Sequence, residues 1–116
     1  MPKPLLLIIA LTVILVVASL TIIYEAQKPR EPSQSEIDTA INQARLVFRQ
    51  RKIAGEDFSK GPCLTNALMP AWVLDIAHNP RQPIDDLAEN MCPAYLEGRA
   101  KHFVELDPDG NLIRAR

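Results

Sequence analysis

The feature that most constrains this chain is an uncharged apolar run from Leu5 to Tyr24. As an α-helix the run would span roughly 30 Å, the thickness of a hydrocarbon core, with its backbone groups satisfied inside the helix. Apolar residues occupy every side of that helix, which argues against a helix lying in the membrane plane. The sequence therefore predicts a transmembrane signal-anchor helix over residues 1–24, with lipid contact from Leu5 to Tyr24.

Cleavage as a secretory signal is the alternative interpretation of this segment. Lys3 supplies a positive flank, and Val16 with Ala18 offers a small-residue cleavage site. Cleavage after Ala18 would leave an apolar remnant that continues to Ile23. The length of the run therefore favours an uncleaved anchor over a removed signal.

The charged flanks are nearly balanced, since Lys3 precedes the run and Lys28 and Arg30 follow it. A very short N-terminal flank is typical of signal-anchors that export their C-terminal domain, and cysteines in that domain suit an oxidising exterior. We expect a single-pass protein of the cytoplasmic membrane with its N-terminus inside and its C-terminal domain outside. A cytosol-facing membrane regulator with reduced cysteines is the alternative.

Residues 25–35 combine prolines and charges without a large aliphatic side chain, which is typical of a linker. A small extracytoplasmic domain is expected over residues 36–116. Ser35 and Asp38 resemble a capping box at the start of an amphipathic helix of about 18 residues. The apolar stripe of that helix comprises Ile37, Ile41, Ala44 and Phe48.

Five prolines between Pro62 and Pro93 exclude long regular elements from the middle of the domain. Residues 71–78 are apolar enough for a buried strand or a short helix, and Trp72 in this stretch is expected to be a core anchor. Further on, residues 102–106 and 111–114 flank the turn sequence Asp107–Gly110, which predicts a β-hairpin. The expected fold class is α+β, with the amphipathic helix packed on a short antiparallel sheet of three or four strands that ends in the hairpin.

Cys63 and Cys92 lie at element boundaries next to prolines. A disulfide between them closes a loop of about 30 residues and contributes about 3–4 kcal/mol by the chain-entropy argument. Export and an even cysteine count favour this bridge.

A zinc site is the sharper alternative for the cysteines. Cys63, His78, Cys92 and His102 form a complete tetrahedral ligand set by residue type. Structural zinc ligands usually come in close pairs, whereas these four are widely spaced in the sequence. The spacing therefore favours no metal and no cofactor.

A catalytic thiolate is a second alternative for Cys63, with His78 as base and Asp75 or Asp85 as the orienting carboxylate. No nucleophile motif accompanies these residues, so the sequence favours a protein that is not an enzyme. His78 is expected instead to bond the backbone, with Asp75 as its partner or as a cap.

Ionisable groups gather around the single tryptophan between residues 72 and 86. We expect this stretch to form a ligand or partner surface, for instance for an envelope protein. A near-neutral balance of 13 basic and 14 acidic residues lacks the basic excess typical of nucleic-acid binding. The sequence thus predicts a membrane-anchored binding or structural module of unknown ligand, with a small Cys/His-based metal-binding or catalytic domain as the alternative. The candidate surface residues are Trp72, Asp75, His78, Arg81, Asp85 and Asp86.

Overall fold

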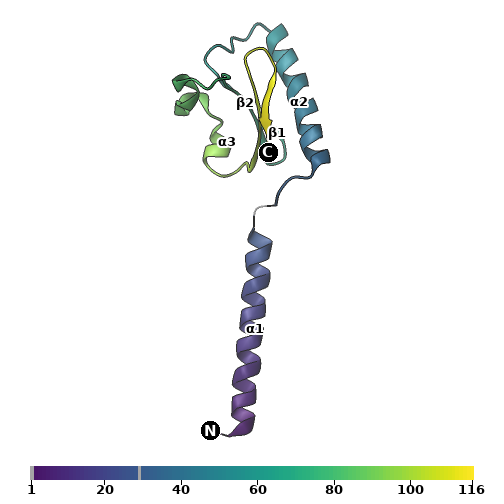
Figure 1. The fold of residues 1–116 in the computed structure, drawn as a ribbon, viewed down its shortest axis with the longest axis vertical. Coiled ribbons are helices and arrows are strands. Elements are labelled where there is room, and N and C mark those ends of the chain that lie inside the picture. Colours follow the sequence, from purple (N-terminus) through teal and green to yellow (C-terminus); the bar gives the residue numbers. More distant parts are fainter. Residues whose placement is uncertain (1, 29) are drawn as a thin grey trace. The chain divides into compact units, whose positions relative to one another are not determined.

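The computed structural model describes residues 2–28 and 30–116 (Figure 1). These residues divide into two compact units, with the division between Arg30 and Glu31. The first unit contains one long helix, and the second contains the helix and sheet of a small domain. Each unit is described by itself below.

Helix α1 (Lys3–Gln27) forms the first unit and is 25 residues long. Its length and apolar composition are sufficient to cross a membrane, and the apolar side chains of its central part are exposed. The hydroxyls of Thr12, Ser19 and Thr21 each donate to a backbone carbonyl four residues earlier, at 2.8–2.9 Å. Because these polar groups are satisfied inside the helix, they need no water.

Helix α2 (Gln34–Ile53) opens the domain, and its start differs from the predicted capping box at Ser35. The N-cap is Ser33, whose hydroxyl oxygen accepts a hydrogen bond from the backbone N–H of Glu36 at 3.1 Å. Gln34 and Ser35 are therefore helical, because the serine two positions earlier already satisfies an amide of the first turn. At the other end the chain reverses at Gly55, which has a φ of +83°.

Four strands form one sheet in the order β1 (Cys63–Met69), β2 (Trp72–Ile76), β3 (His102–Leu106) and β4 (Leu112–Ala115). The α+β class and the terminal hairpin, β3 with β4, are confirmed. The sheet is mixed, which corrects the expected antiparallel pairing: β1–β2 and β3–β4 are antiparallel, but β2 and β3 run parallel.

Parallel pairing of β2 with β3 requires a long crossover connection, and the proline-rich middle of the chain supplies it. Two 3₁₀ turns, η1 (Pro83–Asp86) and η2 (Ala88–Asn90), and the one-turn helix α3 (Pro93–Leu96) occupy this connection. In Figure 1 these turns lie on one side of the sheet and α2 lies on the other.

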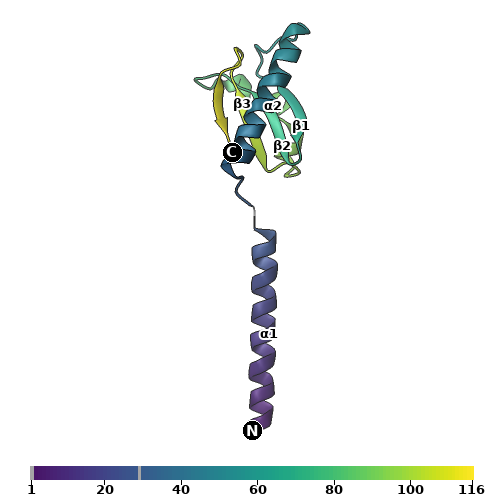
Figure 2. The same cartoon turned by 90° about the vertical axis from the view of Figure 1, so that its right-hand side faces the viewer.

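In Figure 2 α2 crosses in front of the strands. The sheet face that it covers holds the main apolar core. Alternate residues of β2 and β3 point to this face because strand side chains have a period of two. On α2 the small residues Ala40 and Ala44 are fully buried, which lets the helix approach the sheet closely. The strands contribute Leu64, Trp72, Leu74, Ile76, Val104 and Leu106.

The opposite sheet face carries a smaller cluster of Val73, Ala94, Ala100 and Phe103 beside the cysteines. The predicted disulfide between Cys63 and Cys92 is confirmed, with its sulfurs 2.09 Å apart. It ties the first residue of β1 to the residue that precedes α3. The crossover is therefore anchored covalently to the sheet face that it covers.

Candidate ligand-binding pocket

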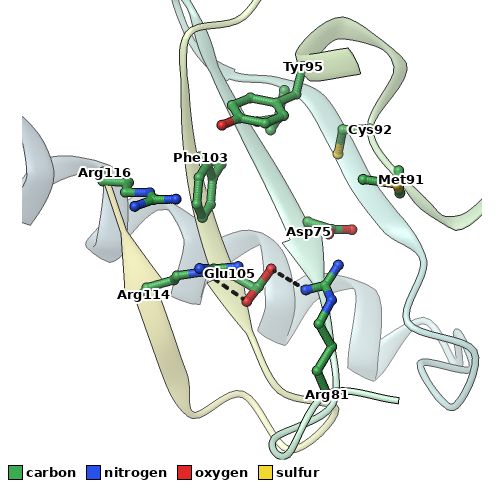
Figure 3. Close-up of a pocket in the computed structure, with 10 residues that line it drawn as sticks. Asp75, Arg81, Met91, Cys92, Tyr95, Phe103, Glu105, Arg114 and Arg116 are labelled. Carbon is green, nitrogen blue, oxygen red and sulfur yellow. Dashed lines mark hydrogen bonds and ion pairs between the residues drawn. The ribbon is translucent and has the colours of Figure 1, made fainter. Parts of the chain in front are cut away.

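A pocket of about 210 Å³ lies on the sheet face opposite α2 (Figure 3). Its charged lining comes from β2, β3, β4, the residue after β4 and the loop after β2: Asp75, Glu105, Arg114, Arg116 and Arg81. Its less polar lining comes mainly from the sheet and the crossover: Val73, Phe103, Met91, Cys92 and Tyr95. Neighbouring strands and the disulfide-anchored crossover thus hold all of these side chains in place.

Two acidic side chains form the centre of the pocket. Asp75 and Glu105 are direct partners in the parallel register of β2 and β3, so they lie side by side on the same face. Glu105 is only 5% exposed. The Oδ1 atom of Asp75 is buried and has no hydrogen-bond partner among the residues that the structure describes. An unsatisfied acceptor of this kind is rare in folded proteins and marks a place where a ligand or a proton can be held.

Burial raises the pKa of Asp75 to about 8, and the neighbouring negative charge of Glu105 acts in the same direction. The guanidinium of Arg81 lowers this pKa but does not compensate. Asp75 is therefore protonated at neutral pH. A neutral carboxylic acid can donate as well as accept a hydrogen bond, which an ionised carboxylate cannot do.

Glu105, in contrast, has a cation at each oxygen. Arg114 Nε lies 3.3 Å from Oε1 and Arg81 Nη1 lies 3.3 Å from Oε2. Figure 3 shows the carboxylate between these two guanidiniums. Arg81 is also fixed elsewhere, because its Nε donates to Asp86 at 2.8 Å and its Nη2 donates to the carbonyl oxygen of Asp85 at 3.3 Å.

An aromatic wall completes the pocket. The rings of Phe103 and Tyr95 meet edge to face with their centroids 5.2 Å apart. The guanidiniums of Arg114 and Arg116 lie 5.3 and 5.5 Å from the centre of the Phe103 ring. Within the described chain, Arg116 makes no side-chain hydrogen bond and Arg114 uses only its Nε. The pocket therefore offers unused cationic donors beside an apolar ring.

The structure does not bring the six predicted surface residues together on one surface. Trp72 is fully buried under α2, where its indole N–H donates to Glu36 at 3.0 Å. Its role is in the core, because alternation along β2 turns it away from Asp75. Asp75 and Arg81 line the pocket. Asp86 lies at the exposed outer side of Arg81.

His78 and Asp85 form a separate pair, which corrects the expected pairing of His78 with Asp75. His78 Nδ1 lies 2.9 Å from Asp85 Oδ1. Asp85 is 2% exposed, and its Oδ2 accepts hydrogen bonds from the backbone N–H groups of His78 and Gln82. Burial raises the pKa of Asp85, but the two N–H groups and the His78 side chain together lower it by more, so the net shift is downward. This aspartate organises the loop that carries Arg81.

The two chemical alternatives for the cysteines are not supported. Both sulfurs are in the disulfide, so neither is available as a zinc ligand or as a nucleophile. The two histidines also have other neighbours, since His78 pairs with Asp85 and His102 packs on Trp72 at a ring distance of 5.0 Å. Across residues 2–28 and 30–116, no group of three or more His, Cys, Asp or Glu side chains has the arrangement of a metal site.

Sequence reasoning missed Glu105, Arg114, Arg116, Phe103 and Tyr95. One signal was present: Asp75 and Glu105 each interrupt an otherwise apolar strand. A charged residue flanked on both sides by core residues indicates a strand whose second face is also partly covered. Their approach to each other depended on the parallel register of β2 with β3, which no local pattern reveals.

Comparison with known proteins finds no matching family model, no matching curated protein and no matching solved structure. The functional argument therefore rests on the geometry of this chain.

Proposed function

We propose that this protein is a membrane-anchored binding module whose domain is displayed outside the cytoplasmic membrane and holds a small ligand in the pocket of Asp75 and Glu105. The observation that carries the proposal is the pocket itself, in which a buried acceptor without a partner lies among unused arginine donors and an aromatic wall. Pockets with a few convergent polar groups and a perturbed pKa are typical of binding sites.

One feature supports display on the outer side. The Cys63–Cys92 disulfide suits an oxidising compartment, and such bridges are rare in the cytosol. On that side of the membrane an envelope protein or a small molecule can reach the pocket.

The lysines of the chain provide an internal test of orientation. Lys3 precedes the apolar run, whereas Lys60 and Lys101 are exposed in the domain. Intact cells, or spheroplasts where an outer membrane is present, are treated with a membrane-impermeant amine reagent, and the labelled peptides are identified by mass. We expect Lys60 and Lys101 to be modified and Lys3 to be protected until lysis. Labelling of Lys3 with protection of Lys60 and Lys101 would show the opposite orientation, with the domain in the cytosol.

Binding is tested with the full chain in detergent micelles, labelled with ¹⁵N and exposed to a panel of cationic, neutral and anionic aromatic fragments. We expect amide shifts for at least one fragment, confined to Val73–Asp75, Phe103–Glu105 and the end of β4. Shifts that map to α2 alone, or an unresponsive pocket across the panel, would refute the binding role.

A further inference from the structure

We infer that the pocket takes a carboxylate-bearing ligand, with the anionic group held by Arg114 and Arg116 and the organic body packed on Phe103. This inference rests on the proposed function and names its ligand class.

The net charge of the pocket lining is the first feature that favours an anionic ligand. At neutral pH the pocket lining carries three guanidiniums, from Arg81, Arg114 and Arg116, against the single ionised carboxylate of Glu105. Asp75 adds no charge in that range because its pKa is about 8. The lining is therefore positive, and a cationic ligand would enter against that charge.

The placement of the free guanidinium donors is the second feature that favours an anionic ligand. Arg81 has its Nε and both terminal nitrogens engaged within the domain. Arg114 lies on β4 and Arg116 directly follows that strand, and both flank one side of Phe103, as Figure 3 shows. A guanidinium presents a planar fork of N–H groups that matches a planar carboxylate. The adjacent ring offers an apolar surface for the rest of the molecule.

Asp75 is the third feature that bears on the ligand. It lines the same pocket and changes its charge at mildly alkaline pH. An ionised Asp75 repels an anion held in the same pocket, whereas a protonated Asp75 does not. Affinity should therefore fall as pH rises through about 8. The titratable and charged groups that face Asp75 from the packed elements are Glu105 on β3, Arg81 in the loop, Asp85 on η1, Arg114 on β4 and Tyr95 on α3.

The test compares four probes of one shape, namely benzoate, benzamide, benzylammonium and phenyl phosphate, by NMR titration of the full chain in micelles. We expect benzoate to bind most tightly and benzamide to bind on the order of tenfold or more weakly. The double variant Arg114→Gln/Arg116→Gln should lose a similar factor. Arg99→Gln is the control for the loss of a positive charge outside the pocket, because Arg99 is exposed and pairs with Glu97.

The pH arm measures benzoate affinity at pH 7 and pH 9. With a pKa of about 8, the protonated fraction of Asp75 falls about tenfold over this interval, and affinity should fall with it. Asp75→Asn should bind benzoate with little dependence on pH. Asp86→Asn, a neighbouring exposed acid paired with Arg81, should keep the dependence of the parent protein.

The outcomes separate the two proposals. Preference for benzylammonium or benzamide at the pocket amides would leave the binding function standing and overturn the carboxylate assignment. Preference for phenyl phosphate would overturn it in favour of a phosphate ligand. Benzoate binding that is equal in the double variant would remove Arg114 and Arg116 from the site. A pocket that responds to none of the four probes would overturn both proposals.

Discussion

The two faces of the sheet differ in nearly every property although the same strands supply both. Beneath α2, Trp72, Leu74 and Val104 are completely buried among apolar neighbours. On the other face, Asp75 and Glu105 occupy the alternate positions of the same strands, and the cover is a crossover of short turns fixed by a disulfide. The first face therefore supplies the stability that lets the second face hold charged groups in costly positions.

The largest expected effect comes from truncating the apolar face. Leu74→Ala removes a fully buried side chain at the centre of the α2 core and should lower the free energy of unfolding by about 3–5 kcal/mol. Val73→Ala, one residue away and facing the crossover, should cost only about 1–2 kcal/mol because fewer atoms are removed. Chemical denaturation of both variants checks this ranking. Equal losses would mean that the pocket face is as tightly packed as the core.

The next effect concerns the covalent anchor of the pocket face. Replacing both cysteines by serine should cost about 3–4 kcal/mol, as expected for a loop of about 30 residues. Such a loss is a large part of the net stability of a small domain. We expect hydrogen exchange to rise first in the crossover, η1 to α3, while β2 and β3 remain the most protected. Uniform loss of protection would show that the two faces unfold as a single unit.

The loop that carries Arg81 gives a third, smaller effect. Asp85→Asn keeps the shape of the side chain but replaces one acceptor oxygen by an NH₂ group, opposite two backbone N–H groups and His78. We expect a loss of about 2–3 kcal/mol at pH 7 from these charge-assisted bonds. Because folding lowers the pKa of Asp85, its contribution is present above about pH 4 and disappears as pH falls through the folded value. The difference in the free energy of unfolding between the parent protein and Asp85→Asn should therefore become smaller at acidic pH, and urea denaturation at pH 7 and pH 3 measures it.

The same contrast between faces explains how far the sequence could lead. Uniform apolarity defined α1, the stripe from Ile37 to Phe48 defined α2, and the Asp107–Gly110 turn defined the hairpin, because each depends on residues close in the chain. The disulfide followed from cysteine count and compartment. The pocket could not be predicted, because Asp75 meets Glu105 only through parallel pairing of distant strands. Trp72 is the core anchor that was expected, but its assignment to the candidate surface was wrong, since composition does not tell which face of a strand a residue occupies.

The last of these effects has the opposite sign and tests the cost of the charged face directly. Between about pH 4 and pH 8 the folded protein keeps a proton on Asp75 that the unfolded chain has released, so the stability of the domain should fall as pH rises through this window and level off above it. Asp75→Asn removes the titration and should raise the free energy of unfolding at pH 7 by no more than about 4 kcal/mol, since about three pKa units lie between the ordinary value and pH 7 and one unit corresponds to about 1.4 kcal/mol.

Urea denaturation of parent and Asp75→Asn proteins from pH 5 to pH 9 measures both the gain and its pH dependence. Asp86→Asn serves as the control, because that carboxylate is exposed and should change stability by no more than about 0.5 kcal/mol. If the free energy of unfolding depends on pH in the same way in the parent and in Asp75→Asn, then Asp75 ionises normally in the folded protein. A gain in stability at neutral pH, together with the predicted loss of pH-dependent benzoate binding, would instead identify Asp75 as a residue kept for ligand recognition at the expense of the fold.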